Sequence, residues 1–159
     1  EGHGDETSLG MTKFYRVSAF AAMGGFVREV MWDGIDCHRC RMMGLIACSW
    51  DEPALRFVHL RPMGSSQQSI YTGRMRHGFG QYFMGTGFLY IFASALKKIP
   101  EKPYVLGAAY MLWGWLKSAL QGKPRYNDLE FRRFLQAYQW RALWVGKRRA
   151  VEEIDQRAR

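Results

Sequence analysis

Two carboxylates three positions apart are the residues best placed to do chemistry. Asp33 and Asp36 stand in the run Trp-Asp-Gly-Ile-Asp, after the glycine pair Gly24-Gly25 and at the start of a helical pattern. Local rules predict that Asp33 caps this helix and that Asp36 follows at its third position, as in a capping box. Acids held at a helix start can also act as a general base towards a ligand at the turn. The residues alone leave both interpretations open.

The elements that must position these acids are short and mixed. The helix from Asp33 is expected to end at Gly44, because glycine readily takes the backbone conformation found just past a helix end. Residues 16–23 predict a shorter helix, ended by the glycine pair. Three further segments are expected to be strands: Thr12–Tyr15, Leu45–Trp50 and Arg56–Arg61. The first 70 residues therefore predict an α/β fold.

The chain changes character after this point. Residues 69–77 are basic and residues 78–87 carry four glycines, which favours a flexible stretch. Two strongly apolar helices are expected over Phe88–Lys97 and Tyr104–Leu120, as a hairpin that is either buried or held at a membrane interface, with true spanning a third alternative. An amphipathic helix is predicted over Asp128–Trp144.

Three segments follow from these patterns. Residues 1–70 form the α/β part, residues 71–145 combine the basic Gly-rich segment with membrane-associating helices, and residues 146–159 form a charged tail expected to fray. The first residue is Glu1 rather than Met, so we expect a processed chain or a fragment.

The quoted motifs resemble the acceptor half of family 2 glycosyltransferases. The resemblance lies in Gly24-Gly25-Phe26, in Asp33-Gly34-Ile35-Asp36 and in the run from Arg39 to Gly44. In that family a GGF … (E/D)D(I/L)D … R…G segment supplies the acceptor-side turn and the catalytic base. Residues 4–8, 74–78 and 81–85 are similar to a bacterial exopolysaccharide-type branch. The resemblance implies a partial GT-A-like half domain of α/β type, followed by C-terminal amphipathic and apolar helices.

The resemblance also implies a reaction. The chain would be the C-terminal part of an inverting enzyme that moves a sugar from a nucleotide-sugar to a glycan or lipid-linked acceptor in surface polysaccharide synthesis. Asp33 or Asp36 would be the base; Asp33 is preferred, although the family usually has adjacent acids where this chain has Asp33-Gly34. Gly24, Gly25 and Trp32 would shape the acceptor site. The nucleotide-binding units would precede residue 1, so the chain alone is expected to be inactive.

The donor diphosphate needs positive charge. By resemblance, a divalent cation (Mg²⁺ or Mn²⁺) would hold it, with His59 as a candidate ligand, while the Asp-x-Asp metal motif of the family would lie before residue 1. A basic segment could close over the diphosphate through charge-assisted hydrogen bonds, namely Arg74, Arg76, His77 and Gln81. A solvated basic loop is the competing interpretation. The Gln-x-x-Arg-Trp motif of processive synthases is not present, because this chain has Gln139-Trp140-Arg141 instead.

The three cysteines do not predict a zinc site. Cys37 and Cys40 are spaced as one zinc knuckle, but only Cys48 and the distant His59 could complete four ligands. Cysteines three positions apart within a helix are ordinary small apolar packing residues. Three cysteines suit a reducing compartment better than a disulfide scaffold.

A formal net charge of +9 predicts an anionic partner. No nucleic-acid-binding motif is recognisable, so nucleic acid is not expected. Basic residues interleaved with aromatics favour an anionic membrane surface, which predicts a peripheral or monotopic protein at the cytoplasmic face of the bacterial inner membrane. The alternative to an enzyme is a non-catalytic, basic membrane-surface adaptor.

Overall fold

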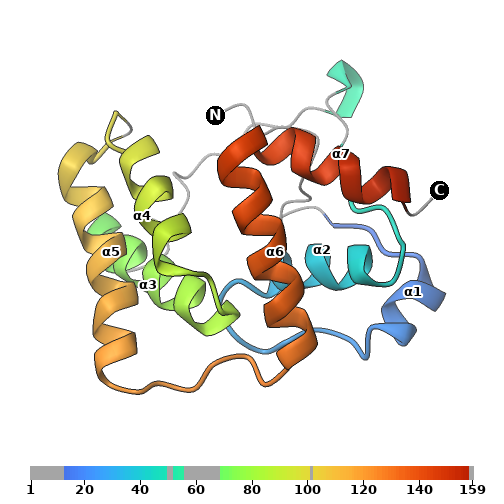
Figure 1. Cartoon of the computed structure of the whole chain (residues 1–159), viewed down its shortest axis with the longest axis horizontal. Coiled ribbons are helices and arrows are strands. Elements are labelled where there is room, and N and C mark those ends of the chain that lie inside the picture. Colours follow the sequence, from blue (N-terminus) through green and yellow to red (C-terminus); the bar gives the residue numbers. More distant parts are fainter. Residues whose placement is uncertain (1–12, 50–51, 56–68, 101, 158–159) are drawn as a thin grey trace. The chain divides into compact units, whose positions relative to one another are not determined.

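Every regular element in the described part of the chain is helical. The computed structural model describes residues 13–49, 52–55, 69–100 and 102–157. The helices (Figure 1) are α1 (Val17–Ala22), α2 (Trp32–Met42), the 3₁₀ turn η1 (Pro53–Leu55), α3 (Ile70–Met84), α4 (Phe88–Lys97), α5 (Tyr104–Leu120), α6 (Leu129–Val145) and α7 (Lys147–Arg157). They form two compact units. Unit 1 comprises residues 1–57 and 133–159, and unit 2 comprises residues 58–132.

The expected α/β fold, a partial GT-A-like half domain, is wrong. The described residues contain helices and no strand or sheet. Two strands were expected at Thr12–Tyr15 and Leu45–Trp50, and their described residues, 13–15 and 45–49, have irregular backbone. The third, Arg56–Arg61, lies outside the described residues. A short apolar run becomes a strand only where a neighbouring strand takes up its backbone hydrogen bonds. None does so in the ranges that the structure describes.

The prediction that Asp33 caps α2 of unit 1 is wrong, because this helix begins one residue earlier, at Trp32. Its N-cap is Met31, which has a φ of 69°, and Asp33 is the second helical residue. The predicted end at Gly44 is confirmed. Gly44 donates its amide to Arg41 O at 3.0 Å, and Leu45 donates to Cys40 O at 2.9 Å. These two bonds form a Schellman motif, which satisfies the last carbonyls of the helix.

The charged tail is ordered rather than frayed. Residues Lys147–Arg157 form α7, whose Ala150 and Val151 are buried. Nε of the buried Arg41, on α2, lies 3.5 Å from Asp155 Oδ1 on α7. The pattern of charges in the tail did not predict this ion pair or the small apolar face. Both stabilise α7 as a helix. The expected short helix at residues 16–23 is confirmed as α1.

Residues 78–84 of the Gly-rich segment belong to helix α3 and not to a flexible loop, and Gly85 and Gly87 follow as the C-cap of α3 and the N-cap of α4. Ser69 caps α3 through a capping box with Thr72: Thr72 N donates to Ser69 Oγ at 3.1 Å, and Ser69 N donates to Thr72 Oγ1 at 3.0 Å. A β-carbon on Gly78 would lie 2.0 Å from the carbonyl oxygen of Met111, and one on Gly114 would lie 2.1 Å from that of Met75. The glycines therefore allow α3 and α5 to pack backbone against backbone.

The expected hairpin is confirmed with the predicted bounds of α4 and α5. The two helices share a small core, made of Ile91, Ala95, Ala108 and Met111. Within the described ranges, no helix combines the length and the apolar character needed to cross a membrane. The predicted helix from Asp128 is also confirmed as α6, with Phe131 N donating to Asp128 Oδ1 at 2.8 Å as an N-terminal cap.

Candidate functional site

The start of α2 in unit 1 is surrounded by four aromatic rings, which we call the aromatic platform: Tyr15, Phe20, Phe26 and Trp32. Phe26 lies edge-on to the other three, with centroid separations of 4.8 to 5.5 Å. Such contacts stabilise beyond simple area burial. The platform ties the irregular segment before α1, α1 itself and the first turn of α2 into one structure.

Lys13 joins the platform to both acids. Its Nζ donates to the backbone carbonyl of Asp33 at 2.7 Å and lies 4.0 Å from Asp36 Oδ2. The same ammonium lies over the rings of Trp32 and Tyr15, 5.4 and 5.6 Å from their centroids. Only 6% of the Lys13 side chain is exposed. The Lys13 ammonium therefore contacts a carbonyl, a carboxylate and two ring faces.

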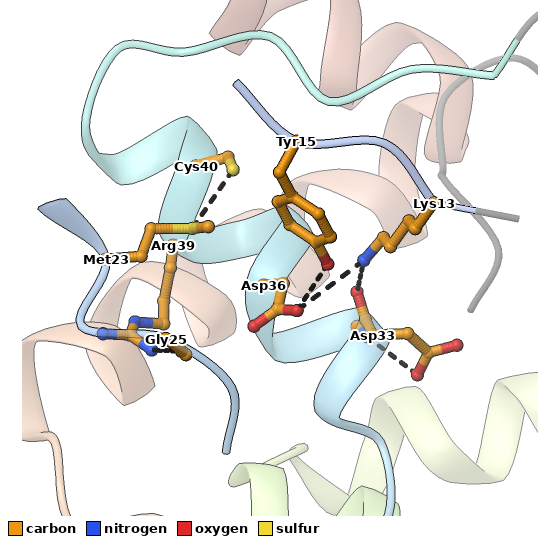
Figure 2. Close-up of polar contacts among 9 residues, drawn as sticks. Lys13, Tyr15, Met23, Gly25, Asp33, Asp36, Arg39 and Cys40 are labelled. Carbon is orange, nitrogen blue, oxygen red and sulfur yellow. Dashed lines mark hydrogen bonds and ion pairs between the residues drawn. The ribbon is translucent and has the colours of Figure 1, made fainter. Parts of the chain in front are cut away.

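Asp36 is buried and held by Tyr15. The Tyr15 hydroxyl donates to Asp36 Oδ2 at 2.7 Å (Figure 2), while Asp36 Oδ1 is buried and has no hydrogen-bond partner among the described residues. Burial raises the pKa of the Asp36 carboxyl above its ordinary value, and the Tyr15 hydrogen bond and the Lys13 charge act against that rise. Burial and the hydrogen bond to Asp36 raise the pKa of Tyr15. Tyr15 is therefore a donor to a carboxylate and not a base.

Asp33 has a different environment. It is only partly buried, and its Oδ1 accepts the amide of Gly34 at 3.0 Å. Figure 2 shows its carboxylate pointing away from Asp36 and from Lys13, although the Lys13 ammonium holds its backbone carbonyl. Of the two acids, Asp33 is the one that a hydroxyl group from outside can approach. Asp36 has the geometry of a supporting residue.

The predicted acceptor residues lie beside this site. Gly24 and Gly25 follow α1 with φ values of 74° and 78°, and Arg39 Nη1 of α2 donates to the carbonyl of Gly25 at 3.3 Å. Trp32, the first residue of α2, belongs to the aromatic platform and contacts Phe26. The glycine turn, Trp32 and Asp33 are thus brought together in unit 1. Their role towards a ligand stays a prediction.

The predicted diphosphate residues all lie on α3, in unit 2, where they contact different neighbours. Arg74 Nη2 donates to the carbonyl of Lys102 at 3.3 Å. His77 and Gln81 face each other, with 3.5 Å between their Nε2 atoms, and Gln81 Oε1 accepts the Thr86 hydroxyl. Arg76 instead borders a shallow groove of about 190 Å³ between α3 and α5, with Lys117 and Lys123. The groove is a positively charged surface.

Metal ligation finds no support among the residues that can be described. No cluster of three or more His, Cys, Asp or Glu side chains that could hold a metal ion occurs in the described ranges, and His59 lies outside them. Cys40 contacts Met23, with 3.3 Å between the sulfur atoms, and burial raises the pKa of its thiol. Burial, and then the nearby Arg41 charge, lower the pKa of His38 to about 3. At neutral pH His38 is an uncharged ring packed against Tyr138, with centroids 4.8 Å apart.

No functional role was predicted from the sequence for Lys13 or Tyr15. Their two-residue spacing places both side chains on one side of an extended backbone, which was the available signal. What could not be read from spacing is that this segment returns to α2, about 20 residues later in the chain, and brings both side chains to Asp36. No protein-family model, no curated protein and no solved structure matches the chain.

Proposed function

We propose that this chain is the acceptor-side, C-terminal part of an inverting glycosyltransferase that uses a nucleotide-sugar donor and a glycan or lipid-linked acceptor. The observation that carries the proposal is the pairing of two unlike carboxylates at the start of α2. Asp33 is approachable and Asp36 is buried and held by Tyr15. The type of reaction is inferred from the resemblance of the surrounding motifs to family 2 glycosyltransferases. The helical fold of the described residues replaces the half domain expected from sequence.

Asp33 is the proposed general base. The acceptor hydroxyl oxygen bonds to the anomeric carbon from the side opposite the leaving group, and its proton passes to the Asp33 carboxylate. The bond from the anomeric carbon to the phosphate oxygen breaks, and its electron pair leaves with the nucleoside diphosphate. One displacement on the opposite face inverts the anomeric configuration. Asp33 suits this role because its side chain meets solvent at a helix start.

Lys13, Tyr15 and Asp36 are proposed to position the base. The Lys13 ammonium fixes the carbonyl of Asp33, and Asp36 anchors both Lys13 and Tyr15. The first turn of α2 is thereby held on the aromatic platform. Gly24-Gly25 and Trp32 are proposed to bound the acceptor. A role in surface polysaccharide synthesis and a divalent cation on the donor diphosphate are further parts of the proposal.

The test uses the longer polypeptide that the resemblance predicts, with a panel of nucleotide-sugars. Release of nucleoside diphosphate is measured together with the anomeric configuration of the product. The substitution Asp33→Asn is expected to lower the transfer rate about 100-fold to 10,000-fold, the usual contribution of a general base, with the helical circular-dichroism spectrum unchanged. Glu29→Gln, at an exposed acid just before α2, is the matched control. Undiminished transfer by the Asp33→Asn enzyme, or retention of configuration, contradicts the proposal.

A non-catalytic membrane-surface adaptor is the alternative function. The exposed apolar side chains of α4 and α5 favour it, because such faces bind partners or membranes. An adaptor has no use for a base, so Asp33→Asn would leave its binding unchanged and no nucleotide-sugar would be consumed. The transfer assay therefore separates the two functions.

A further inference from the structure

Two adjacent helices in unit 2 each expose a row of large apolar side chains. On α4 the exposed residues are Phe88, Leu89, Phe92 and Leu96, and on α5 they are Val105, Leu106, Trp113, Leu116 and Leu120. They recur mostly at steps of three and four residues, so each row follows one side of its helix. Between 41% and 74% of each side chain is exposed. Single exposed apolar residues are normal, but nine on two neighbouring helices indicate a binding surface. We call them the hairpin faces.

The hairpin faces belong to well-packed helices. The opposite sides of α4 and α5 supply Ile91, Ala95, Ala108 and Met111 to a shared core, in which Ile91 and Met111 are each 1% exposed. The bounds of both helices also match the apolar segments of the sequence. The exposure is therefore a property of the folded hairpin and not of loosely packed chain.

Positive charge accompanies the hairpin faces. Between residues 88 and 123 the chain has five lysines and one glutamate, a formal net charge of +4. Lys97, Lys98 and Lys102 lie at the connection between the helices, whereas Lys117 and Lys123 lie towards the end of α5 and just after it. Lysines can lay their apolar stems along a surface and keep the ammonium in water. Tyr104 and Trp113, both about half exposed, are residue types typical of the membrane interface.

We propose that the hairpin faces of α4 and α5 dock into the interfacial layer of an anionic lipid bilayer, with the flanking lysines on lipid phosphates. An amphipathic surface binds such a layer by apolar burial together with attraction to anionic headgroups. Lipid is favoured over a second copy of the chain because two surfaces of the same positive charge repel each other. The inference does not depend on the proposed reaction, since none of the hairpin residues belongs to the site around Asp33.

The test is flotation of the full chain with vesicles. Two compositions are compared, pure phosphatidylcholine and phosphatidylcholine with roughly one third phosphatidylglycerol. We expect binding to the mixed vesicles that weakens several-fold on pure phosphatidylcholine. Trp113→Gln is expected to lower the partition coefficient about tenfold, because about half of a large aromatic surface loses its burial in lipid. Loss of binding by Asp33→Asn is not expected, so failure of the reaction proposal and failure of this one are distinguishable.

Matched control variants lie outside the hairpin. Trp140 on α6 is 55% exposed, compared with 50% for Trp113, so Trp140→Gln removes the same side chain at similar exposure. Leu120→Gln and Leu129→Gln form a second pair, on α5 and α6. We expect only the hairpin variants to lose vesicle binding, with the circular-dichroism spectra of all four unchanged. Equal loss in both members of a pair overturns the proposal.

Hydrogen exchange gives an independent readout. On adding mixed vesicles, amides of α4 and α5 are expected to gain protection, while those of α2 do not. A chain that fails to bind vesicles, and instead forms a concentration-dependent dimer that Trp113→Gln dissociates, overturns the lipid assignment and identifies a second copy as the occupant. Light scattering over a range of protein concentrations measures that outcome.

Discussion

Gly78 lies so close to Met111 that a β-carbon on residue 78 would come within 2.0 Å of the Met111 carbonyl oxygen. No pair of unbonded atoms tolerates that separation, so the backbones of α3 and α5 are in contact because residue 78 is glycine. Gly114 makes the reciprocal approach to Met75. A glycine that local rules treat as a source of flexibility is here the condition for close helix packing.

The substitution Gly78→Ala is therefore expected to destabilise the chain. Alanine is the better helix former by about 1 kcal/mol, but separating two packed helices costs about 3 kcal/mol or more. The steric cost exceeds the propensity gain, so the free energy of unfolding falls. Chemical denaturation followed by circular dichroism measures it. Gly122→Ala is the control, because residue 122 has a φ of 60° and no atom within 4 Å of an added β-carbon. It is expected to lose only about 1 kcal/mol. Equal losses would contradict the packing argument.

The sequence predicts the helices well where apolar residues recur at helical spacing. The bounds of α4 and α5 follow from their apolar segments, and Gly44 ends α2 as expected. The predicted strand at Leu45–Ser49 does not form, because a strand needs a partner strand and no local pattern shows whether one is present. The predicted flexibility of the glycines in α3 is also wrong, because these glycines are explained only by packing against the distant α5. The site follows the same rule. Asp33 and Asp36 could be found from spacing, whereas the approach of Lys13 and Tyr15 depends on tertiary structure.

The ion pair between Arg41 and Asp155 is expected to stabilise unit 1 far more than the surface pairs of α7. Only 1% of the Arg41 side chain is exposed, and 19% of that of Asp155. Asp155→Ala takes the carboxylate away from the buried Arg41 guanidinium, so it is expected to cost about 3 kcal/mol. The matched control is Glu152→Ala, which removes an exposed pair with Arg148 and is expected to change nothing measurable. Thermal unfolding of both variants is the measurement, and similar midpoints would contradict the difference in burial.

His38 is expected to make unit 1 sensitive to acid. Its pKa is lowered from 6.5 to about 3 in the folded chain, so between these pH values the unfolded chain binds the proton and the folded chain does not. The free energy of unfolding therefore rises with pH, and its His38 contribution is lost as pH falls from about 6.5 towards 3. The full shift of the His38 pKa corresponds to about 5 kcal/mol of unfolding free energy.

His38→Phe keeps a ring against Tyr138 and removes the titration. We expect its unfolding free energy to depend less steeply on pH than that of the parent chain over this window. Comparing the two slopes cancels any constant change in packing. Parallel curves from denaturation at a series of pH values would show that His38 titrates normally in the folded chain.

Asp36 is expected to have the opposite pH dependence. Burial raises the pKa of its carboxyl in the folded chain, so just above the ordinary value of 3.8 the folded chain binds more protons than the unfolded one. The free energy of unfolding therefore falls as pH rises through the folded pKa. Asp36→Asn keeps an acceptor for the Tyr15 hydroxyl and removes the charge. The variant is expected to gain stability relative to the parent between about pH 3 and about pH 7.

Tyr15→Phe is the counterpart of Asp36→Asn, because it removes the donor and leaves the buried carboxylate. A lost hydrogen bond to a charged group costs about 1.5–3 kcal/mol, so this variant is expected to be less stable than the parent, and most clearly at about pH 7, where the carboxyl is ionised. Opposite signs for the two variants at neutral pH would establish that burial of the Asp36 charge opposes folding and that Tyr15 reduces its cost. If both variants lose stability equally at every pH, Asp36 is not a buried charge, and Lys13 and Tyr15 do not hold α2 through it.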